Sequence, residues 1–430
     1  MGDRLNNTLE LSMLNEKSKH SNQSIGFLIP EFPGQTHNFF WRERQALGEL
    51  GIKTHLVSTQ KPPKGIVSPS WARQAERETI YLYPVLIEDF SGIIGVLLKA
   101  GPLAWLNCIK VLLGALDLSV VQRAKLIAFI PLAAKLVVVA RSQKWNHLHV
   151  HSCGNAANIA LFASQLSNLT YSLTLHNPLA VYGGNQSQKW SHACFALVIT
   201  KAIYDDVTNN IEANLLPKLF IAPMGVDTVK FLRSTPYRPY DGRGQLRLFS
   251  CARLNPGKGF NFLVLALSLL KKQSLDIQLV IAGEDDEGGT GYRANLEKQI
   301  SDLGLDVNVT LLGAVSEEQV LAELENAHLF VLASLEEPLG VAIMEAMAMN
   351  VPTISTQAGG VPELILNETD GILVPPGDPD AFADAIHNLA EDKEKAIRIS
   401  KASRMKIIQS FSHRRSAETI AYALSHLNLT

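Results

Sequence analysis

A chain of 430 residues is too long for one ordinary hydrophobic core and fits two domains of about 200 residues each. Hydrophobic residues make up 47% and charged residues 19%, which excludes a largely disordered chain. The formal net charge of -2 excludes an overall basic field of the kind that attracts nucleic acid.

The first 23 residues are polar and lack the apolar segment of a secretory signal, so we expect a disordered tail over residues 1–23. Short apolar runs then alternate with longer helical patterns. In the first half the predicted strands cover residues 25–29, 54–57, 147–151, 171–175, 197–200 and 219–221. Apolar strands separated by helices indicate a parallel sheet covered on both faces. The sequence therefore predicts an N-terminal Rossmann-like domain over residues 24–228.

Residues 93–144 combine apolar helical patterns with seven basic residues and a single acid, Asp117. A spanning helix needs roughly 20 apolar residues. The longest run here without a charge, residues 100–109, is shorter and contains Pro102, so we predict no span. Two interpretations stay open: core helices with solvated lysines, or a surface that makes peripheral contact with an anionic membrane.

The second half repeats the alternation, with predicted strands at residues 246–250, 277–282, 309–312, 329–332 and 353–355. The turn-rich segment 224–244 interrupts the pattern, and we place the interdomain linker there. We expect a second Rossmann-like domain over residues 229–410 and a C-terminal helix, about residues 411–430, that packs back on the first domain. The predicted fold class is α/β, with two doubly wound domains facing an interdomain cleft.

Two cations and two glycines follow the first strand of the second half, in Arg253-Leu-Asn-Pro-Gly257-Lys258-Gly259. Cations and glycines between a strand and a helix can hold a phosphate group, because the backbone approaches closely and the helix start is positive. The segment fits neither GxGxxG nor the P-loop pattern, so on its own a solvated surface turn is the better interpretation.

Two carboxylates, Glu337 and Glu345, follow the strand at residues 329–332, and a helix is expected to begin near Gly340. Each carboxylate can accept hydrogen bonds from two adjacent sugar hydroxyls. Glu337 could instead be only a helix-capping acid. Glu345 stands in a run of Ile, Met and Ala, where an acid is costly to bury without a partner.

These residues belong to an ordered set of motifs that resembles a known family. The set comprises Arg253-Leu-x-x-x-Lys258-Gly259, Gly283-Glu284, Leu312-Gly313, Ser334, Glu337-x7-Glu345-Ala346 and Gly359-Gly-Val-Pro-Glu363. It resembles the retaining, nucleotide-sugar-dependent glycosyltransferases of family 4, which have the GT-B fold. The opening Phe32-Pro-Gly-Gln-Thr-His-Asn-Phe39 with Arg42-Glu43, and also His149-Val-His151, Thr174-Leu-His176 and Met224-Gly-Val-Asp227, are similar to the colanic-acid and exopolysaccharide branch.

The resemblance implies a role for each motif residue. Arg253 and Lys258 hold the donor diphosphate, Glu337 the transferred sugar and Glu345 the ribose. Backbone groups at Leu339, Gly340 and Val341 add to phosphate binding, and Gly313 and Ala314 contact the base. His176 acts at the sugar-transfer site, and Gly34 lies in a substrate-binding motif.

The activity implied is transfer of a hexose, with retention, from a UDP- or GDP-sugar to a saccharide, expected to be lipid-linked, in exopolysaccharide or cell-surface polysaccharide biosynthesis. Neither a divalent metal nor another cofactor is expected, since the two cations can do the electrostatic work of a metal. Four scattered cysteines indicate reduced thiols in a cytoplasmic protein, here at most peripheral at the inner face of the membrane.

The residues give less support to three other interpretations. A dehydrogenase needs GxGxxG after the first strand, where this chain has Pro30-Glu-Phe-Pro-Gly34. A catalytically weak binding or scaffolding protein on the same fold is the alternative function. It is favoured only by Leu179-Ala180, where an acid commonly follows the first-domain histidine of the family. His147, His149 and His151 share one face of a strand and could be read as a zinc site, although no further ligand is evident.

Overall fold

The computed structural model describes residues 23–34, 37–62, 71–285 and 291–427. The chain divides into two compact units. Among the described residues, unit 1 holds 23–62, 71–223 and 414–427, and unit 2 holds 224–413. The tail predicted over residues 1–23 lies outside the described residues except for Gln23.

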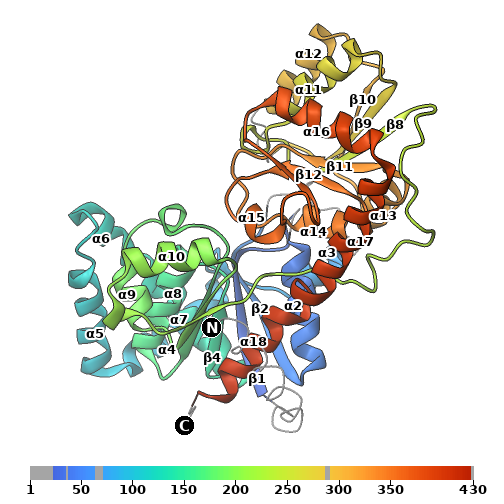
Figure 1. The fold of residues 1–430 in the computed structure, drawn as a ribbon. Helices are drawn as coiled ribbons and strands as arrows, with labels where there is room; N and C mark the ends of the chain where they lie inside the picture. The colour runs from blue at the N-terminus through green and yellow to red at the C-terminus, as the bar shows by residue number, and fades with distance from the viewer. Residues whose placement is uncertain (1–22, 35–36, 63–70, 286–290, 428–430) are drawn as a thin grey trace. The chain divides into compact units, whose positions relative to one another are not determined.

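Unit 1 is built on a seven-stranded parallel sheet with the order β3-β2-β1-β4-β5-β6-β7 (Figure 1). Its elements are β1 (Gln23–Glu31), α2 (Asn38–Glu49), β2 (Ile52–Gln60), α3 (Ala72–Glu78), β3 (Ile80–Tyr83), η1 (Ile87–Asp89), α4 (Phe90–Lys99), α5 (Gly101–Gly114), α6 (Val120–Leu126), α7 (Phe129–Gln143), β4 (His147–Val150), α8 (Asn155–Leu166), β5 (Thr170–Leu175), η2 (Leu179–Tyr182), α9 (Gln186–Ser191), β6 (Phe195–Val198), α10 (Lys201–Asn210), η3 (Ala213–Leu215), β7 (Lys218–Ile221) and α18 (Arg414–Ser425).

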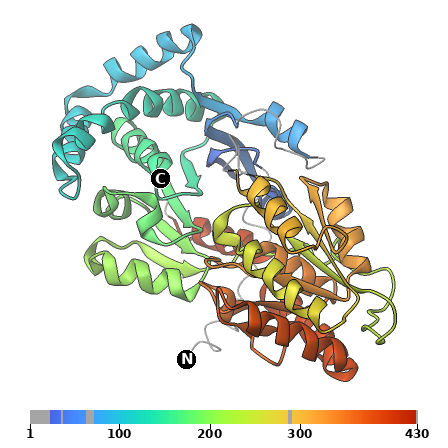
Figure 2. The ribbon, with the colours of Figure 1, turned by 90° about the horizontal axis from the view of Figure 1, so that it is seen from above.

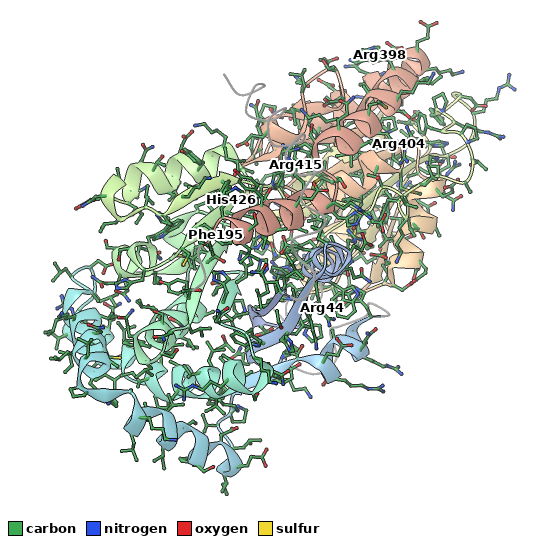
Figure 3. All side chains as sticks on the ribbon, turned by 90° about the horizontal axis from the view of Figure 1, so that it is seen from below. Arg44, Phe195, Arg398, Arg404, Arg415 and His426 are labelled. Atoms are coloured by element: carbon green, nitrogen blue, oxygen red, sulfur yellow. The ribbon has the colours of Figure 1, made fainter. Side chains whose placement is uncertain are left out.

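Both faces of this sheet are covered, as continuous apolar strands predict. On one face, Phe27 of β1 packs in a core with residues of α2 and of the C-terminal helix α18. A series of ring contacts, Phe195–Phe220, Phe220–Tyr422 and Tyr422–His426, leads from β6 to the end of α18 (Figure 3). On the other face α7 and α8 pack against the strands.

Helices α4, α5 and α6 form an additional layer of unit 1, because α4 packs on α7 and α5 packs on α8 rather than on the sheet. Figure 2 shows these cyan and blue helices along one edge of the unit. Among the described residues, no single helix is long and apolar enough to cross a membrane. The segments Ile87–Lys99 and Gly101–Gly114 meet that test only together, and they are bent by 96°.

Unit 2 is built on a six-stranded parallel sheet with the order β10-β9-β8-β11-β12-β13 (Figure 1). Its elements are β8 (Leu246–Cys251), η4 (Pro256–Lys258), α11 (Phe260–Lys272), β9 (Ile277–Ala282), α12 (Tyr292–Asp302), β10 (Val309–Gly313), α13 (Glu317–Asn326), β11 (Leu329–Leu332), α14 (Val341–Ala348), β12 (Thr353–Thr356), α15 (Val361–Leu364), β13 (Ile372–Val374), α16 (Pro379–Glu391) and α17 (Lys393–Ser410).

Helical spacing explains how α11 covers one face of this sheet. Phe260, Leu263, Val264, Leu267 and Leu270 recur at intervals of three and four residues and are buried in the core with α16. Helices α13 and α14 pack against β8, β11 and β12. The fold class predicted from the sequence, two doubly wound parallel α/β domains, is confirmed.

The turn-rich segment predicted as a linker is ordered against unit 2. The Arg404 guanidinium, labelled in Figure 3, donates hydrogen bonds to the carbonyl oxygens of Phe231 at 2.9 Å and Thr228 at 3.2 Å. The Tyr237 hydroxyl donates to the His328 carbonyl at 2.8 Å. The division between the units falls at Pro223 and Met224, at the beginning of this segment.

All four cysteines are free thiols. Cys108 and Cys153 are buried, and Cys194 and Cys251 are partly buried.

Candidate active site

The order of the strands in unit 2 identifies where a ligand can bind. The chain runs outward from β8 through β9 to β10 and then returns to β11 on the other side of β8. In a doubly wound sheet, ligands bind beyond the carboxyl ends of the strands at this reversal. The loops after β8 and β11 meet there, since the Leu335 N–H donates to the Gly257 carbonyl at 2.8 Å. These loops carry Arg253, Lys258 and Glu337.

An ion pair joins the two loops. Lys258 Nζ lies 2.6 Å from Glu337 Oε2, and the Ser334 hydroxyl donates to the same oxygen at 3.2 Å. The Lys258 side chain is 18% exposed and that of Glu337 9%, so the pair is largely withdrawn from water. A cation and a carboxylate predicted to share a ligand are therefore adjacent, with their polar ends at the edge of the sheet.

Two glycines set this geometry. Gly259 and Gly359 have φ values of +64° and +55°, in the left-handed region. A Cβ on Gly259 would lie 2.0 Å from the Ala333 carbonyl oxygen, and one on Gly359 would lie 2.2 Å from that of Glu337. Both positions therefore require glycine, because any side chain would push the Glu337 loop away.

Glu345 lies on the second turn of α14, as predicted, and is buried. Burial raises the pKa of the Cys251 thiol to about 12, and the negative charge of Glu345 adds to the shift. The Glu345 carboxylate thus lies close to the end of β8. The reversal point of the sheet consequently has two carboxylates near it, Glu337 on the loop and Glu345 on the helix.

The two helices that follow β8 and β11 have no side-chain cap at their N-termini. Helix α11 starts after Gly259 and α14 after Gly340, which has a φ of +96°. By contrast, Ser316 caps α13 and Asp378 caps α16 through side-chain oxygens. The first N–H groups of α14, near Leu339 and Val341, can therefore face an anion.

The other residues predicted to bind the nucleotide-sugar lie at the same carboxyl edge of the sheet. Arg253 is exposed on the loop after β8, and Ala314 is exposed after β10. Gly313 ends β10 and accepts a hydrogen bond from the Gly283 N–H at 2.8 Å. The structure thus places the residues of β10, β8 and β11 at the carboxyl edge of one sheet, and it brings Lys258 and Glu337 into direct contact.

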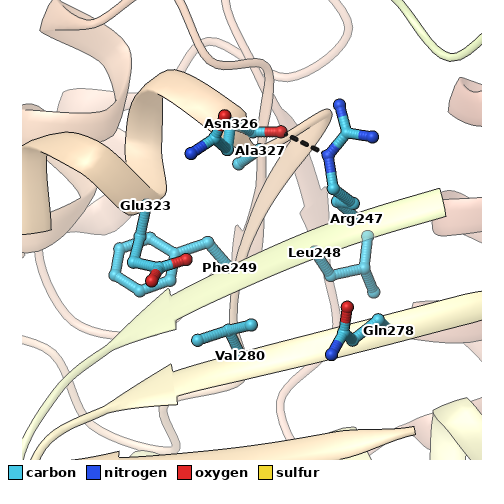
Figure 4. Close-up of a pocket in the computed structure, with 8 residues that line it drawn as sticks. All are labelled: Arg247, Leu248, Phe249, Gln278, Val280, Glu323, Asn326 and Ala327. Atoms are coloured by element: carbon cyan, nitrogen blue, oxygen red, sulfur yellow. Dashed lines mark hydrogen bonds between the residues drawn. The ribbon is translucent and has the colours of Figure 1, made fainter. Parts of the chain in front are cut away.

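A cavity of about 240 Å³ elsewhere in unit 2 is not this site. It lies between α13 and the strands β8 and β9, with Arg247 and Gln278 in its lining (Figure 4). Both are the second residues of their strands, so the cavity lies toward the amino end of the sheet. Arg247 Nε also donates to the Asn326 carbonyl at 2.7 Å, and none of the predicted site residues lines the cavity.

In unit 1 the corresponding reversal lies between β1 and β4, and histidines follow the strands there. His176, after β5, has its Nε2 3.2 Å from Nδ1 of His151, which follows β4. His151 Nε2 lies 3.1 Å from Glu43 Oε2 on α2. Ser416 of α18 donates a hydrogen bond to the same carboxyl group. His176 is therefore the first member of a chain of polar side chains that ends on Glu43.

Burial decides the protonation of this cluster. It lowers the pKa of both His151 and His176 to about 3 and raises the pKa of Glu43. The two imidazoles are thus neutral at neutral pH. One hydrogen bond joins the two rings, between His151 Nδ1 and His176 Nε2, and which nitrogen donates depends on the tautomers. His151 Nε2 and Glu43 Oε2 lie close to each other but do not form a hydrogen bond. His176 Nδ1 is buried and has no hydrogen-bond partner among the described residues.

Glu43 stands in the opening motif, but no role was predicted for it from the sequence. An acid within the apolar helical pattern of Phe39, Phe40 and Trp41 is the signal that could have identified it, since buried acids need partners. The rings of Phe39 and Phe40 lie 5.1 and 5.3 Å from that of His176.

For the zinc interpretation, the structure places Glu43 close to His149 and His151, and His147 is not part of this group. Ligand atoms of Glu43, His149 and His151 lie within 4.8 Å of one another. Both ring nitrogens of His149, however, are hydrogen-bonded to the hydroxyls of Ser172 and Thr174, at 2.7 and 2.8 Å. His147 is engaged in the same way by Thr170 and Ser172. These contacts favour hydrogen-bonded core histidines.

Gly34 lies on the loop after β1, and its carbonyl accepts a hydrogen bond from the His37 N–H at 3.2 Å. A Cβ on Gly34 would lie 2.5 Å from the His37 ring. The ring of His37 stacks on Phe32 and meets the edge of Phe40. Gly34 thus permits an aromatic cluster next to His151 and His176.

Comparison with known proteins agrees with this geometry. Residues 242–406 match the family model described as glycosyl transferases group 1, and this segment comprises most of unit 2. The amylovoran biosynthesis glycosyltransferase AmsK of Erwinia amylovora is 31% identical over 219 residues, which cover 49% of this chain and 51% of AmsK. The Escherichia coli protein WcaL, assigned to colanic acid biosynthesis as a glycosyltransferase, is 29% identical over 202 residues, which cover 45% of this chain and 48% of WcaL. The matched segments thus span about half of these relatives.

Solved structures show the same fold over nearly the whole chain. Anabaena HepE in complex with UDP and glucose covers 94% of this chain with a TM-score of 0.71 and 19% identity, and all of HepE is covered. Sucrose-phosphate synthase of Thermosynechococcus elongatus covers 94% of this chain, and 98% of its own, with a TM-score of 0.71 and 18% identity. The two units therefore have the folds of a GT-B protein.

Proposed function

We propose that the chain, whose residues 242–406 match the glycosyl transferases group 1, is a retaining glycosyltransferase. It transfers a hexose from a UDP- or GDP-sugar to a saccharide, lipid-linked acceptor in the biosynthesis of an exopolysaccharide or cell-surface polysaccharide. The observation that carries the proposal is the contact of Lys258 with Glu337 at the reversal point of the sheet. The names of AmsK and WcaL support the class of product.

The donor diphosphate binds where positive potential is concentrated. Arg253, Lys258 and the uncapped start of α14 at Leu339, Gly340 and Val341 face the same edge. As the glycosidic bond breaks, the leaving diphosphate gains charge, and fixed cations and N–H groups lower the energy of that state. Lys258 has three donors, of which Glu337 uses one.

The ribose, the base and the transferred sugar of the donor bind at the carboxyl ends of different strands of unit 2. Glu345, close to the end of β8, accepts hydrogen bonds from the ribose hydroxyls. Gly313 and Ala314 at the end of β10 contact the base, and Glu337 on the other side accepts from hydroxyls of the transferred sugar. In this proposal the base lies at the end of β10, the ribose and the diphosphate near the end of β8, and the transferred sugar near the loop after β11.

Unit 1 binds the acceptor. Gly34 permits the aromatic cluster of Phe32, His37 and Phe40 at this site, and His176 is the polar group that contacts the acceptor. Glu43 and His151 are positioning residues in this proposal, because His151 is hydrogen-bonded to His176 at 3.2 Å and Glu43 lies 3.1 Å from the other ring nitrogen of His151. Divalent metal and other cofactors have no role in this proposal, since Arg253 and Lys258 neutralise the diphosphate.

The test is transfer from labelled UDP- and GDP-hexoses to lipid-linked saccharides extracted from the membranes of the source cells. We expect one donor to be used and the anomeric configuration to be retained, as read by NMR. Glu345→Gln, which keeps the shape of the side chain, should abolish transfer. A protein that binds nucleotide but transfers nothing would instead support the alternative, a binding or scaffolding protein on this fold.

A further inference from the structure

The outer layer of unit 1 exposes an unusual amount of apolar surface. More than half of the large apolar side chains that the described chain exposes fall within residues 83–127. We name this surface the α4–α6 face and define it by its most exposed members, Ile87, Leu98, Leu103, Leu116 and Val120, which are 91, 80, 68, 79 and 81% exposed.

Helices α4, α5 and α6 carry apolar residues on both their inner and their outer sides, and only the inner sides pack against the rest of unit 1. On α5, the small residues Ala104 and Cys108 are buried, whereas Leu103 and Leu106 of the same turns are exposed. A helix that is hydrophobic all round is normally buried on all sides. Contiguous apolar surface of this kind marks an interaction site rather than ordinary surface.

The charged residues within helices α4, α5 and α6 are all basic, whereas the acids of this layer, Glu88, Asp89 and Asp117, lie before α4 and between α5 and α6. Lys99, Lys110 and Lys125 are exposed among the apolar side chains. Between residues 93 and 144 there are seven basic residues and one acid, although the whole chain carries -2. That acid, Asp117, accepts a hydrogen bond from the Asn185 N–H at 2.6 Å.

We propose that the α4–α6 face binds an anionic lipid bilayer. A bilayer offers an apolar interior and a negative surface together, which matches leucines and isoleucines interspersed with lysines. A second copy of the chain fits less well, because a two-fold interface would place this basic face against itself. Trp105, 38% exposed on α5, has the amphipathic ring that membrane interfaces favour.

The bent pair of segments fits a surface contact rather than a span. The helical segments Ile87–Lys99 and Gly101–Gly114 turn by 96° at residue 100, and α4 and α5 both pack on helices of unit 1. Only their outer sides are available to lipid. The role in bringing unit 1 to a lipid-linked acceptor rests on the proposed function, whereas the lipid contact does not.

The test is sedimentation of the full chain with vesicles of phosphatidylcholine, alone or mixed with phosphatidylglycerol. We expect binding to the mixed vesicles only. Val120→Asp should weaken it about tenfold, since burying one such side chain is worth roughly that factor. Val307→Asp is the matched control, because Val307 is 82% exposed on unit 2, and it should bind as the unchanged chain does.

The charge contribution is tested separately. Lys99→Gln with Lys110→Gln should weaken binding roughly 25-fold, at about fivefold for each lysine near the surface. Lys272→Gln with Lys401→Gln, both exposed on unit 2, is the control and should have no effect. Nucleotide affinity should be the same in all four variants as in the unchanged chain. If the unchanged chain binds no nucleotide, that result counts against the proposed function and not against the lipid contact.

Two results would overturn the proposal. One is equal binding, or none, to both kinds of vesicle. The other is self-association of the free chain, by light scattering, that Val120→Asp abolishes, since a second copy would then cover the α4–α6 face.

Discussion

Replacing Lys258 by methionine removes the ammonium group but keeps a side chain of similar length. In the structure Nζ lies 2.6 Å from Glu337 Oε2, and the two side chains are 18% and 9% exposed. A hydrogen bond to a charged group contributes about 1.5–3 kcal/mol when buried, and an exposed ion pair less than about 1 kcal/mol. For this partly buried pair we expect the free energy of unfolding to fall by about 1–2 kcal/mol.

Transfer should fall much further than stability. Losing one preorganised contact to a developing charge typically costs about 10²–10³ in turnover. The assay combines urea denaturation, nucleotide titration calorimetry and transfer rates for Lys258→Met, Glu337→Gln and the double variant. Because the two side chains touch, the stability effects should be non-additive, with a coupling of about 1 kcal/mol.

Arg253→Ala is the companion variant, and it should reduce transfer by a similar factor. Strictly additive stability effects of Lys258→Met and Glu337→Gln would show that the ion pair does not form in solution. Full transfer by folded Lys258→Met would refute the diphosphate assignment.

His176→Ala should lower turnover by about 10²-fold or more while calorimetric nucleotide affinity stays unchanged; an equal loss in both would place His176 at the donor or in the fold. Transfer should survive dialysis against EDTA, and a loss restored by Mg²⁺ or Mn²⁺ would contradict the metal-free mechanism. Gly359→Ala should destabilise the chain by about 2 kcal/mol or more, because its Cβ meets the Glu337 carbonyl at 2.2 Å, whereas Gly242→Ala, at φ +82° in open space, should cost only about 1 kcal/mol in urea denaturation; equal costs would refute the crowding argument. Burial lowers the pKa of His147, His151 and His176 to about 3, so below the unfolded value of 6.5 the unfolded chain binds more protons, and stability should fall by up to about 1.4 kcal/mol per histidine per pH unit between pH 6.5 and 3; equal urea midpoints at about pH 7.5 and 5.5 would contradict this.

The strands predicted from apolar runs are all present, because strands buried on both faces are almost continuous in apolar residues. Two further strands, β3 (Ile80–Tyr83) and β13 (Ile372–Val374), were not predicted. Both are edge strands of three or four residues. So short a run carries no distinguishable period, and its pairing is decided by the neighbouring strand.

For the site, residue types and order were predictable, but contacts were not. The sequence indicated that Lys258 and Glu337 share a ligand, and only the loops folded over Gly259 and Gly359 bring them together. Glu43 remained unassigned because its partner His151 is more than 100 residues away along the chain. The outer face of α4–α6 could not be distinguished from a core helix, since the apolar pattern is the same on both sides.

The most direct test of the account is thermal melting of the full chain with a panel of nucleoside diphosphates. At 100 times its dissociation constant, a ligand that binds only the native state adds about 2.7 kcal/mol of stability. We predict that UDP or GDP raises the melting temperature and that Lys258→Met and Glu345→Gln remove the shift. If no nucleoside diphosphate stabilises the chain, or if the shift persists in both variants, the carboxyl edge of β8 and β11 is not a nucleotide-sugar site.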